Sequence, residues 1–175
     1  KKKNALLILD EIQSGYGRSG KFFAFQHHKI KPDIITIAKG MANGFPMGGV
    51  LISKKHKAKF GMLGTTFGGN HLACTAALSV LNIIEQEKLI DNVNDIYKYF
   101  LNQIKSVPQV KQVKGKGLML GVEFDFEVGE LRKKLIFEKH IFTGGSSNKN
   151  LLRILPPLNI SKEQINQFVI ALKEL

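Results

Sequence analysis

Three short apolar runs in the first third of the chain constrain its fold most strongly. They cover residues 5–9, 34–38 and 49–52, and Gly-rich connections separate them. Continuous apolar runs of this length are typical of strands that are buried on both faces, as in parallel sheets covered by helices. We therefore predict an α/β fold whose first part contains buried strands of a largely parallel sheet.

Two helices are predicted to follow these strands. Asn70 can accept hydrogen bonds from the first free amides of a helix that runs to about Glu87. Apolar and small residues leave this helix little polar face, so we expect it to be buried. A second helix from about Ile90 carries apolar residues at three- and four-residue spacing on one face, with a polar face opposite, and Pro108 lies just beyond its end.

The pattern changes after Pro108 to β-β-α-β-α. We expect the last helix to begin at Ser161, because Ser161 with Gln164 three residues later fits a capping box. We place a domain boundary near residue 106, which divides the chain into residues 1–106 and a smaller α+β domain of residues 107–175. The elements expected in the second part are strands at residues 110–114, 118–124 and 151–155 and helices at residues 130–139 and from 161.

Composition argues against several classes of protein. The chain of 175 residues has a formal net charge of +12, but only three of its 26 basic residues are Arg, and no aromatic residues are interleaved to form a stacking surface for nucleic acid. No apolar run approaches the roughly 20 residues of a membrane span. The histidines lack metal-ligand spacing, so no metal site is expected. A single cysteine, Cys74, fits a reducing compartment, and we expect a cytoplasmic protein.

The start of the chain is unusual for a complete domain. Position 1 is not Met, and the first apolar run begins almost at once. We expect the chain to be a piece of a longer protein.

Asp10 and Lys39 each follow an apolar run directly. In parallel sheets, the carboxyl ends of the strands meet at one edge, where ligands bind. A partly desolvated lysine can form a Schiff base, and a carboxylate in the same cleft can keep a pyridinium nitrogen protonated. This pair favours pyridoxal chemistry, although the position of Lys39 alone fits an ordinary solvated lysine better.

Two Gly-rich segments suggest phosphate binding. Residues 64–70, Gly-Thr-Thr-Phe-Gly-Gly-Asn, precede the first helix, where backbone amides can hold phosphate, but an ordinary turn and cap has the same pattern. Residues 15–21 spell Gly-x-x-x-x-Gly-Lys, as in nucleotide-hydrolysing enzymes. That motif requires Ser or Thr after its lysine and a strand before it, whereas Phe22 follows Lys21 here. The nucleotide-binding hypothesis is therefore disfavoured.

Taken together, these motifs resemble the class III pyridoxal-phosphate aminotransferases, and the acetylornithine aminotransferase branch in particular. The resemblance rests on the order and spacing of residues 9–21, 32–40, 44–49 and 64–70. It implies the C-terminal part of a fold-type-I large domain followed by an α+β small domain, and pyridoxal 5'-phosphate as the cofactor. His71 stands where the family usually has Pro, which is compatible with a first helical turn.

The resemblance also implies a role for each candidate residue. Lys39 would carry the cofactor and move the substrate proton, Asp10 would pair with the pyridine nitrogen, and Gln13 would contact the phenolic oxygen. Thr66 would bind the phosphate of the neighbouring subunit's cofactor, which implies a homodimer, and Thr65 would lie near the substrate. Arg153 would clamp a substrate carboxylate, although a surface ion pair would also account for an arginine there.

The expected reaction transfers the terminal amino group of N-acetylornithine or N-succinylornithine to 2-oxoglutarate in arginine biosynthesis. Ornithine, 4-aminobutyrate or succinyl-diaminopimelate could instead be the donor. The rest of the family's active site lies upstream of this chain, so the chain alone is not expected to transaminate. A binding or dimerisation module without chemistry is the alternative from another class, but such a module has no need for Lys39, Asp10 and Gln13 in this spacing.

Overall fold

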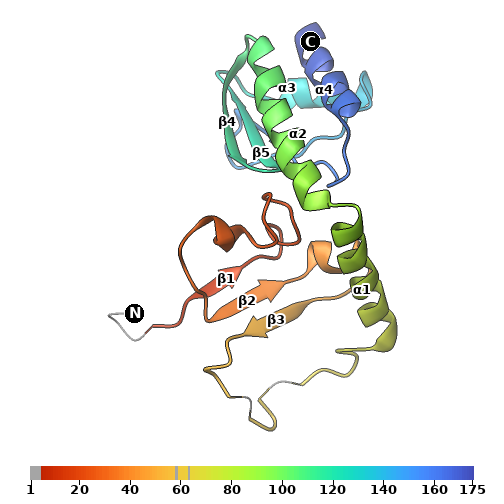
Figure 1. Cartoon of the computed structure of the whole chain (residues 1–175). Helices are drawn as coiled ribbons and strands as arrows, with labels where there is room; N and C mark the ends of the chain where they lie inside the picture. Colours follow the sequence, from red (N-terminus) through yellow and green to blue (C-terminus); the bar gives the residue numbers. More distant parts are fainter. Residues whose placement is uncertain (1–4, 58, 63) are drawn as a thin grey trace. The chain divides into compact units, whose positions relative to one another are not determined.

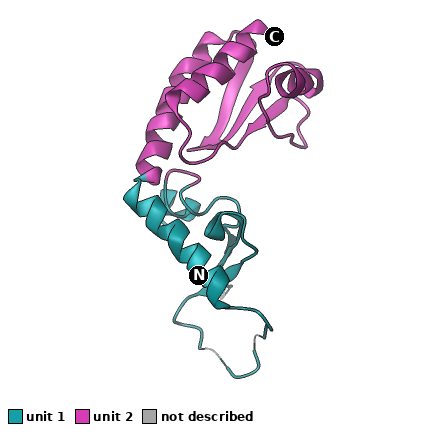
Figure 2. Ribbon diagram, turned by 90° about the vertical axis from the view of Figure 1, so that its right-hand side faces the viewer, with its two compact units in different colours: residues 1–17, 21–88 teal, residues 18–20, 89–175 magenta. Residues whose placement is uncertain are grey.

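The structure is a computed structural model that describes residues 5–57, 59–62 and 64–175. The chain combines β-sheets with α-helices, in agreement with the predicted α/β class (Figure 1). The chain forms two compact units, shown in Figure 2: residues 1–17 with 21–88, and residues 18–20 with 89–175.

The sheet of the first unit has three strands, in the order β1-β2-β3. Strand β1 (Ile8–Asp10) runs parallel to β2 (Ile34–Ile37), whereas β2 and β3 (Gly49–Ile52) are antiparallel. The prediction of a largely parallel sheet is therefore wrong for β3. A parallel return needs a connection of about a dozen residues or more, usually a helix. The chain between β2 and β3 holds only the short 3-10 helix η2 (Lys39–Ala42) and a turn, which favours the antiparallel arrangement.

Apolar side chains of the first unit are more exposed than the sequence pattern predicts. Strands β1 and β3 were expected to be buried, yet most of their residues are exposed. Helix α1 (His71–Gln86), also expected to be buried, buries only Ala73, Ala77 and Ile84. An apolar sequence pattern shows only which residues are apolar. Burial also requires another layer of structure to cover them, and no such layer among the described residues covers these faces. The exposed apolar residues of these elements are Ile8, Val50, Leu51, Ile52, Leu72, Leu78, Leu81 and Ile83.

The second unit follows the predicted β-β-α-β-α order after helix α2 (Leu89–Gln103) and the short 3-10 helix η3 (Ile104–Ser106). Its antiparallel sheet has the order β4-β5-β6. The other elements of this unit are β4 (Val110–Lys116), β5 (Met119–Phe124), α3 (Gly129–Phe137), β6 (Leu151–Ile154) and α4 (Lys162–Glu174).

One face of this sheet packs into a single apolar core. Alternate residues of β5 point into it, and side chains from α2, α3 and α4 fill it. The rings of Phe100 on α2 and Phe168 on α4 stack with their centroids 6.2 Å apart. The opposite face of the sheet is polar and carries Glu123 and Arg153, because neighbouring residues of a strand point to opposite faces.

Helix α2 belongs to the second unit. Its buried residues Val93, Ile96 and Phe100 are part of that unit's core. The domain boundary predicted from the sequence lies near residue 106, after this helix. That boundary concerns the domains of the longer protein and stays a prediction, while the compact units divide between Lys88 and Leu89.

Residues 18–20 pack with the second unit although they are distant from it in sequence. The amide of Leu118 donates to the carbonyl of Arg18 at 2.9 Å, and the Asn94 side chain donates to the carbonyl of Gly20 at 3.0 Å. The Arg18 guanidinium donates to the carbonyls of Leu118 and Pro156. Burial lowers the pKa of Arg18. These contacts attach the three residues to the hairpin between β4 and β5, to α2 and to the segment after β6.

Candidate active site

Asp10 is the last residue of β1, and its carboxylate is held at the carboxyl edge of the sheet. It lies opposite Thr36 of the parallel strand β2. Asp10 Oδ1 accepts hydrogen bonds from the amide of Ile12 at 2.9 Å and from the hydroxyl of Thr36 at 3.3 Å. Both of these bonds go to Oδ1, so the exposed carboxylate can present Oδ2 to a ligand. The predicted edge position of Asp10 is confirmed.

Lys39 is the first residue of η2 and lies at the same edge, two residues beyond the end of β2. It is exposed. The next residue, Gly40, lies against Tyr16: a Cβ at Gly40 would come within 3.2 Å of Tyr16 Cβ. Tyr16 is itself buried, and burial raises the pKa of its hydroxyl. The turn after β1 and the start of η2 therefore pack closely, which fixes the backbone beside Lys39.

Glu11 is a structurally important residue that the sequence analysis left without a role. Its side chain is buried, with 3% of the residue exposed, and its carboxylate accepts bonds from the amides of Ala24 at 3.0 Å and Phe25 at 2.8 Å. The hydroxyl of Ser14 also donates to it. The sequence does contain a signal for the burial of Glu11, because Asp10 and Glu11 follow an apolar run as a pair of carboxylates. Adjacent residues at a strand end point to opposite sides, so the two carboxylates have different surroundings. Glu11 closes the loop that follows Asp10.

Gln13 lies half-buried in the turns that follow β1.

The segment after β1 also excludes the nucleotide-binding hypothesis. A phosphate loop leads into a helix, whereas Lys21 is followed by a bend and by the four-residue 3-10 helix η1 (Ala24–His27). Residues 18–20, the middle of the supposed loop, pack with the second unit.

Thr65 and Thr66 lie exposed in the segment before α1. Asn70 caps α1 as predicted, because its side chain accepts from the amide of Ala73 at 3.0 Å. The methyl group of Thr65 folds over Gly68, where a Cβ would come within 2.0 Å of it. Among the described residues, no hydrogen bond joins Thr65 or Thr66 to Asp10 or Lys39.

Arg153 belongs to the second unit and lies on β6. Its neighbours Leu152 and Ile154 point into the core, so the guanidinium points to the polar face and is exposed. The ion pairs formed by the described residues do not include Arg153. The alternative that it serves a surface ion pair therefore finds no support in the described part of the chain.

No helix among the described residues is long and apolar enough to cross a membrane. No group of three His, Cys, Asp or Glu side chains among them is placed to hold a metal ion.

The residues at the sheet edge of the first unit suit a pyridoxal cofactor. A carboxylate with a free oxygen can bind a protonated ring nitrogen, and an exposed lysine amine can reach an aldehyde carbon. The fold and this edge thus define a class of proteins, the pyridoxal-phosphate-dependent transferases of mixed α/β fold.

The comparisons with known proteins narrow this class to a family. The sequence profile described as "Aminotransferase class-III" matches residues 1–175, so the chain belongs to the class-III aminotransferases. It is 42% identical to the acetylornithine aminotransferase of Methanocaldococcus jannaschii over 99% of this chain and 44% of that protein. It is 43% identical to the Bacillus subtilis acetylornithine aminotransferase over 99% of this chain and 46% of that protein. The chain therefore spans about half the length of the curated relatives that it matches.

Solved structures agree with this assignment. A Bacillus anthracis aminotransferase matches with a TM-score of 0.87 at 33% identity, covering 99% of this chain and 45% of that one. The ornithine aminotransferase of Toxoplasma gondii matches with a TM-score of 0.86 at 30% identity, covering 99% of this chain and 43% of that one. Another structure of the Toxoplasma enzyme has partial occupancy of PLP at its active site.

Proposed function

We propose that this chain is part of an enzyme that transfers the terminal amino group of N-acetylornithine or N-succinylornithine to 2-oxoglutarate in arginine biosynthesis. Curated acetylornithine aminotransferases at 40–43% identity support this substrate class. The observation that supports the chemistry is the parallel pairing of β1 and β2, since Asp10 ends β1 and Lys39 follows β2 at the same edge of the sheet. The proposal includes a homodimer, as the resemblance implies, and the cytoplasmic location expected from the single cysteine.

Each residue has a distinct task in this proposal. Lys39 would hold pyridoxal phosphate through its amine and would act as the base that moves the substrate proton. Asp10, already oriented through Oδ1, keeps the ring nitrogen protonated, and Gln13 contacts the phenolic oxygen. When bound, the cofactor supplies an electron sink that lowers the cost of removing the substrate proton.

The remaining residues bind phosphate and substrate. Thr66 binds phosphate, and in this proposal it reaches the cofactor of the neighbouring subunit, while Thr65 lies near the substrate. Arg153 grips a substrate carboxylate with two parallel hydrogen bonds, for which an exposed guanidinium outside the ion pairs of the described residues is suited.

The decisive experiment maps the lysine that binds the cofactor. The purified chain is mixed with pyridoxal phosphate and reduced with borohydride, and mass spectrometry then locates the modified lysine. Selective labelling of Lys39 supports the proposal. Labelling spread over the lysines calls for the same experiment on the whole protein, where failure to label Lys39 would contradict the proposal.

Activity of the whole protein provides the second test. Lys39→Ala should lower transamination by about a thousandfold or more, because the group that carries the proton is lost. Lys54→Ala is the matched control, since Lys54 is an exposed lysine beyond β3. A non-catalytic module would tolerate both substitutions.

Ornithine is the second candidate donor, and the similarity to the Toxoplasma ornithine aminotransferase supports it. Assays of the whole protein with N-acetylornithine, N-succinylornithine, ornithine, 4-aminobutyrate and succinyl-diaminopimelate would rank the donors. A kcat/KM for ornithine above that for both acylated donors would overturn the preferred substrate.

A further inference from the structure

Arg153 has a glycine on each side of it within the second unit. On one side it pairs with Gly121 of β5. On the other side it forms an isolated bridge with Gly144, in which the amide of each residue donates to the carbonyl of the other at 2.8 and 2.9 Å. Directly opposed residues of antiparallel strands project to the same face of a sheet. Residues 121, 144 and 153 therefore share one face of the sheet.

The guanidinium lies against Gly144. A Cβ at Gly144 would come within 2.8 Å of Arg153 Nε and 3.3 Å of Nη2. A Cβ at Gly121 would instead meet the methyl groups of Leu151. The Arg153 side chain thus extends across the backbone of Gly144, and a side chain at residue 144 would force the guanidinium to move.

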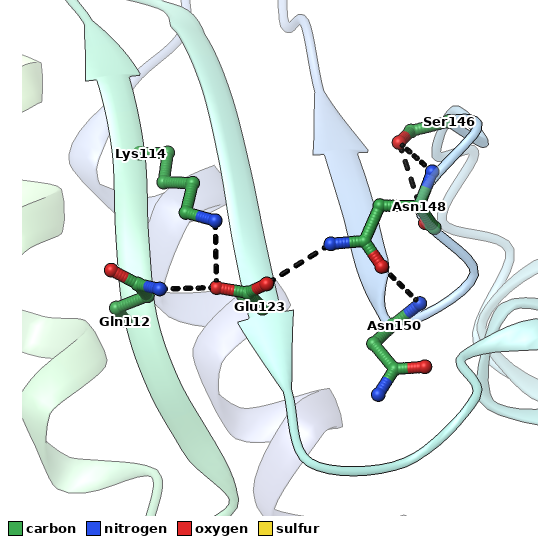
Figure 3. A network of polar contacts seen from close by, with 6 residues as sticks. All are labelled: Gln112, Lys114, Glu123, Ser146, Asn148 and Asn150. Atoms are coloured by element: carbon green, nitrogen blue, oxygen red, sulfur yellow. Dashed lines mark hydrogen bonds and ion pairs between the residues drawn. The ribbon is translucent and has the colours of Figure 1, made fainter.

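The segment that contains Gly144 is anchored on both sides. Before it, the Arg132 side chain donates through Nε to the carbonyl of Thr143 at 3.0 Å. After it, the Asn148 side chain donates to Glu123 of β5 at 3.0 Å and accepts from the amide of Asn150 at 3.0 Å, as Figure 3 shows.

Glu123 is in turn held by two side chains of β4. Lys114 forms an ion pair with Glu123 at 2.9 Å, and Gln112 donates to the same carboxylate (Figure 3). The Lys114 hydrogen bond is the largest cause that lowers the pKa of Glu123. The Glu123 carboxylate therefore anchors the segment through Asn148, and its interactions with the described residues are with Lys114, Gln112 and Asn148 rather than with Arg153.

We propose that Gly144 is a positioning residue, which directs the Arg153 guanidinium so that it meets a substrate carboxylate in a two-pronged contact. The inference rests on the proposed function of Arg153 and extends it to a residue that touches neither substrate nor cofactor. A planar guanidinium must match the carboxylate plane, so a tilt weakens recognition even when the charge is kept.

The kinetic test compares two adjacent glycines in the whole protein. Gly144→Ala should raise the KM for N-acetylornithine by roughly tenfold or more, with a smaller change in kcat, because a misplaced binding group loses affinity. Gly145→Ala is the matched control: a Cβ there would meet only Arg132 Nη1, at an ordinary 3.6 Å. Neither glycine has a positive φ, so alanine fits both backbones. The control should stay within about twofold.

A conservative substitution separates positioning from general damage. In an Arg153→Lys background, Gly144→Ala should change KM by no more than about twofold, because lysine has no planar group above residue 144. An equal penalty in both backgrounds, or equal effects of the two glycine substitutions, would overturn the inference. An unchanged KM in Arg153→Lys alone would overturn both the inference and the proposed role of Arg153.

A measurement without turnover separates the inference from the proposed function. The chain has only three arginines, so its Nε–Hε NMR signals can be assigned with one Arg→Lys variant each. Gly144→Ala should shift the signal of Arg153, and Gly145→Ala should leave that signal in place. If the signal shifts while the whole protein fails to use N-acetylornithine, the proposed function fails and the positioning by Gly144 stands. An unshifted Arg153 signal would refute the positioning.

Discussion

The second unit buries the apolar residues of its sheet and helices in one core, whereas the first unit leaves apolar residues of β1, β3 and α1 exposed. Asp10, Lys39 and both threonines belong to the less covered unit, while Arg153 lies on the polar face of the well-packed one. Large exposed apolar surfaces usually mark interaction sites. We therefore expect substitutions in the first unit to affect activity more than stability, and core substitutions in the second unit to do the opposite.

The largest expected effect on stability comes from the core of the second unit. Phe100 is fully buried and stacks on Phe168, so Phe100→Ala should lower the free energy of unfolding by about 3–5 kcal/mol. Leu78→Ala on α1 is the comparison, because Leu78 is 59% exposed, and it should change stability by about 0.5 kcal/mol or less. Urea unfolding of each variant measures both values. Similar losses for the two would break the contrast between the units.

The attachment of residues 18–20 to the second unit predicts a smaller effect. Gly117 has a φ of +57°, and a Cβ there would come within 2.5 Å of the Ser19 carbonyl carbon. Gly117→Ala should therefore destabilise by roughly 1–3 kcal/mol, because backbone atoms must move. Gly129→Ala at the start of α3 meets nothing within 4 Å and should be neutral or stabilising. A neutral Gly117→Ala would show that residues 18–20 are not held to the hairpin.

Helix caps provide a matched comparison of the two units. Asn70→Ala removes the cap of α1, and Ser161→Ala removes the capping box of α4. Each should cost about 1 kcal/mol in its own unit. Hydrogen exchange of amides in α1 and α4 would resolve the two effects. If Asn70→Ala also weakened protection in α4, the units would not be independent in stability.

The smallest expected effect is the pH dependence due to Glu123. Lys114, followed by Gln112 and Asn148, lowers the pKa of Glu123 in the folded chain, so the folded state favours the ionised form. The resulting stabilisation is complete above the unfolded pKa of about 4.3 and is lost as pH falls through the lower folded pKa. Glu123→Gln should reduce the loss of stability in acid relative to the unsubstituted chain. Identical acid profiles in thermal unfolding would contradict this account.

Local patterns were sufficient for much of the fold. The bounds of β3, the cap of α1 at Asn70, the capping box at Ser161 and the β-β-α-β-α order all agree with the sequence analysis. These features depend on neighbouring residues, through side-chain periodicity and hydrogen bonds to nearby amides. The placement of Asp10 and Lys39 at one edge was also predictable, because two apolar strands in a parallel arrangement end on the same side.

Contacts between distant segments decided the rest. The sequence by itself determined the family and most elements, since motifs and periodicity are local. Only the tertiary structure decided the antiparallel β3, the burial of Glu11 and the packing of residues 18–20 with the second unit. It also decided that Gly144 lies under the Arg153 guanidinium. The physical reason is that burial and close approach depend on which segments meet in space, and no local pattern records this.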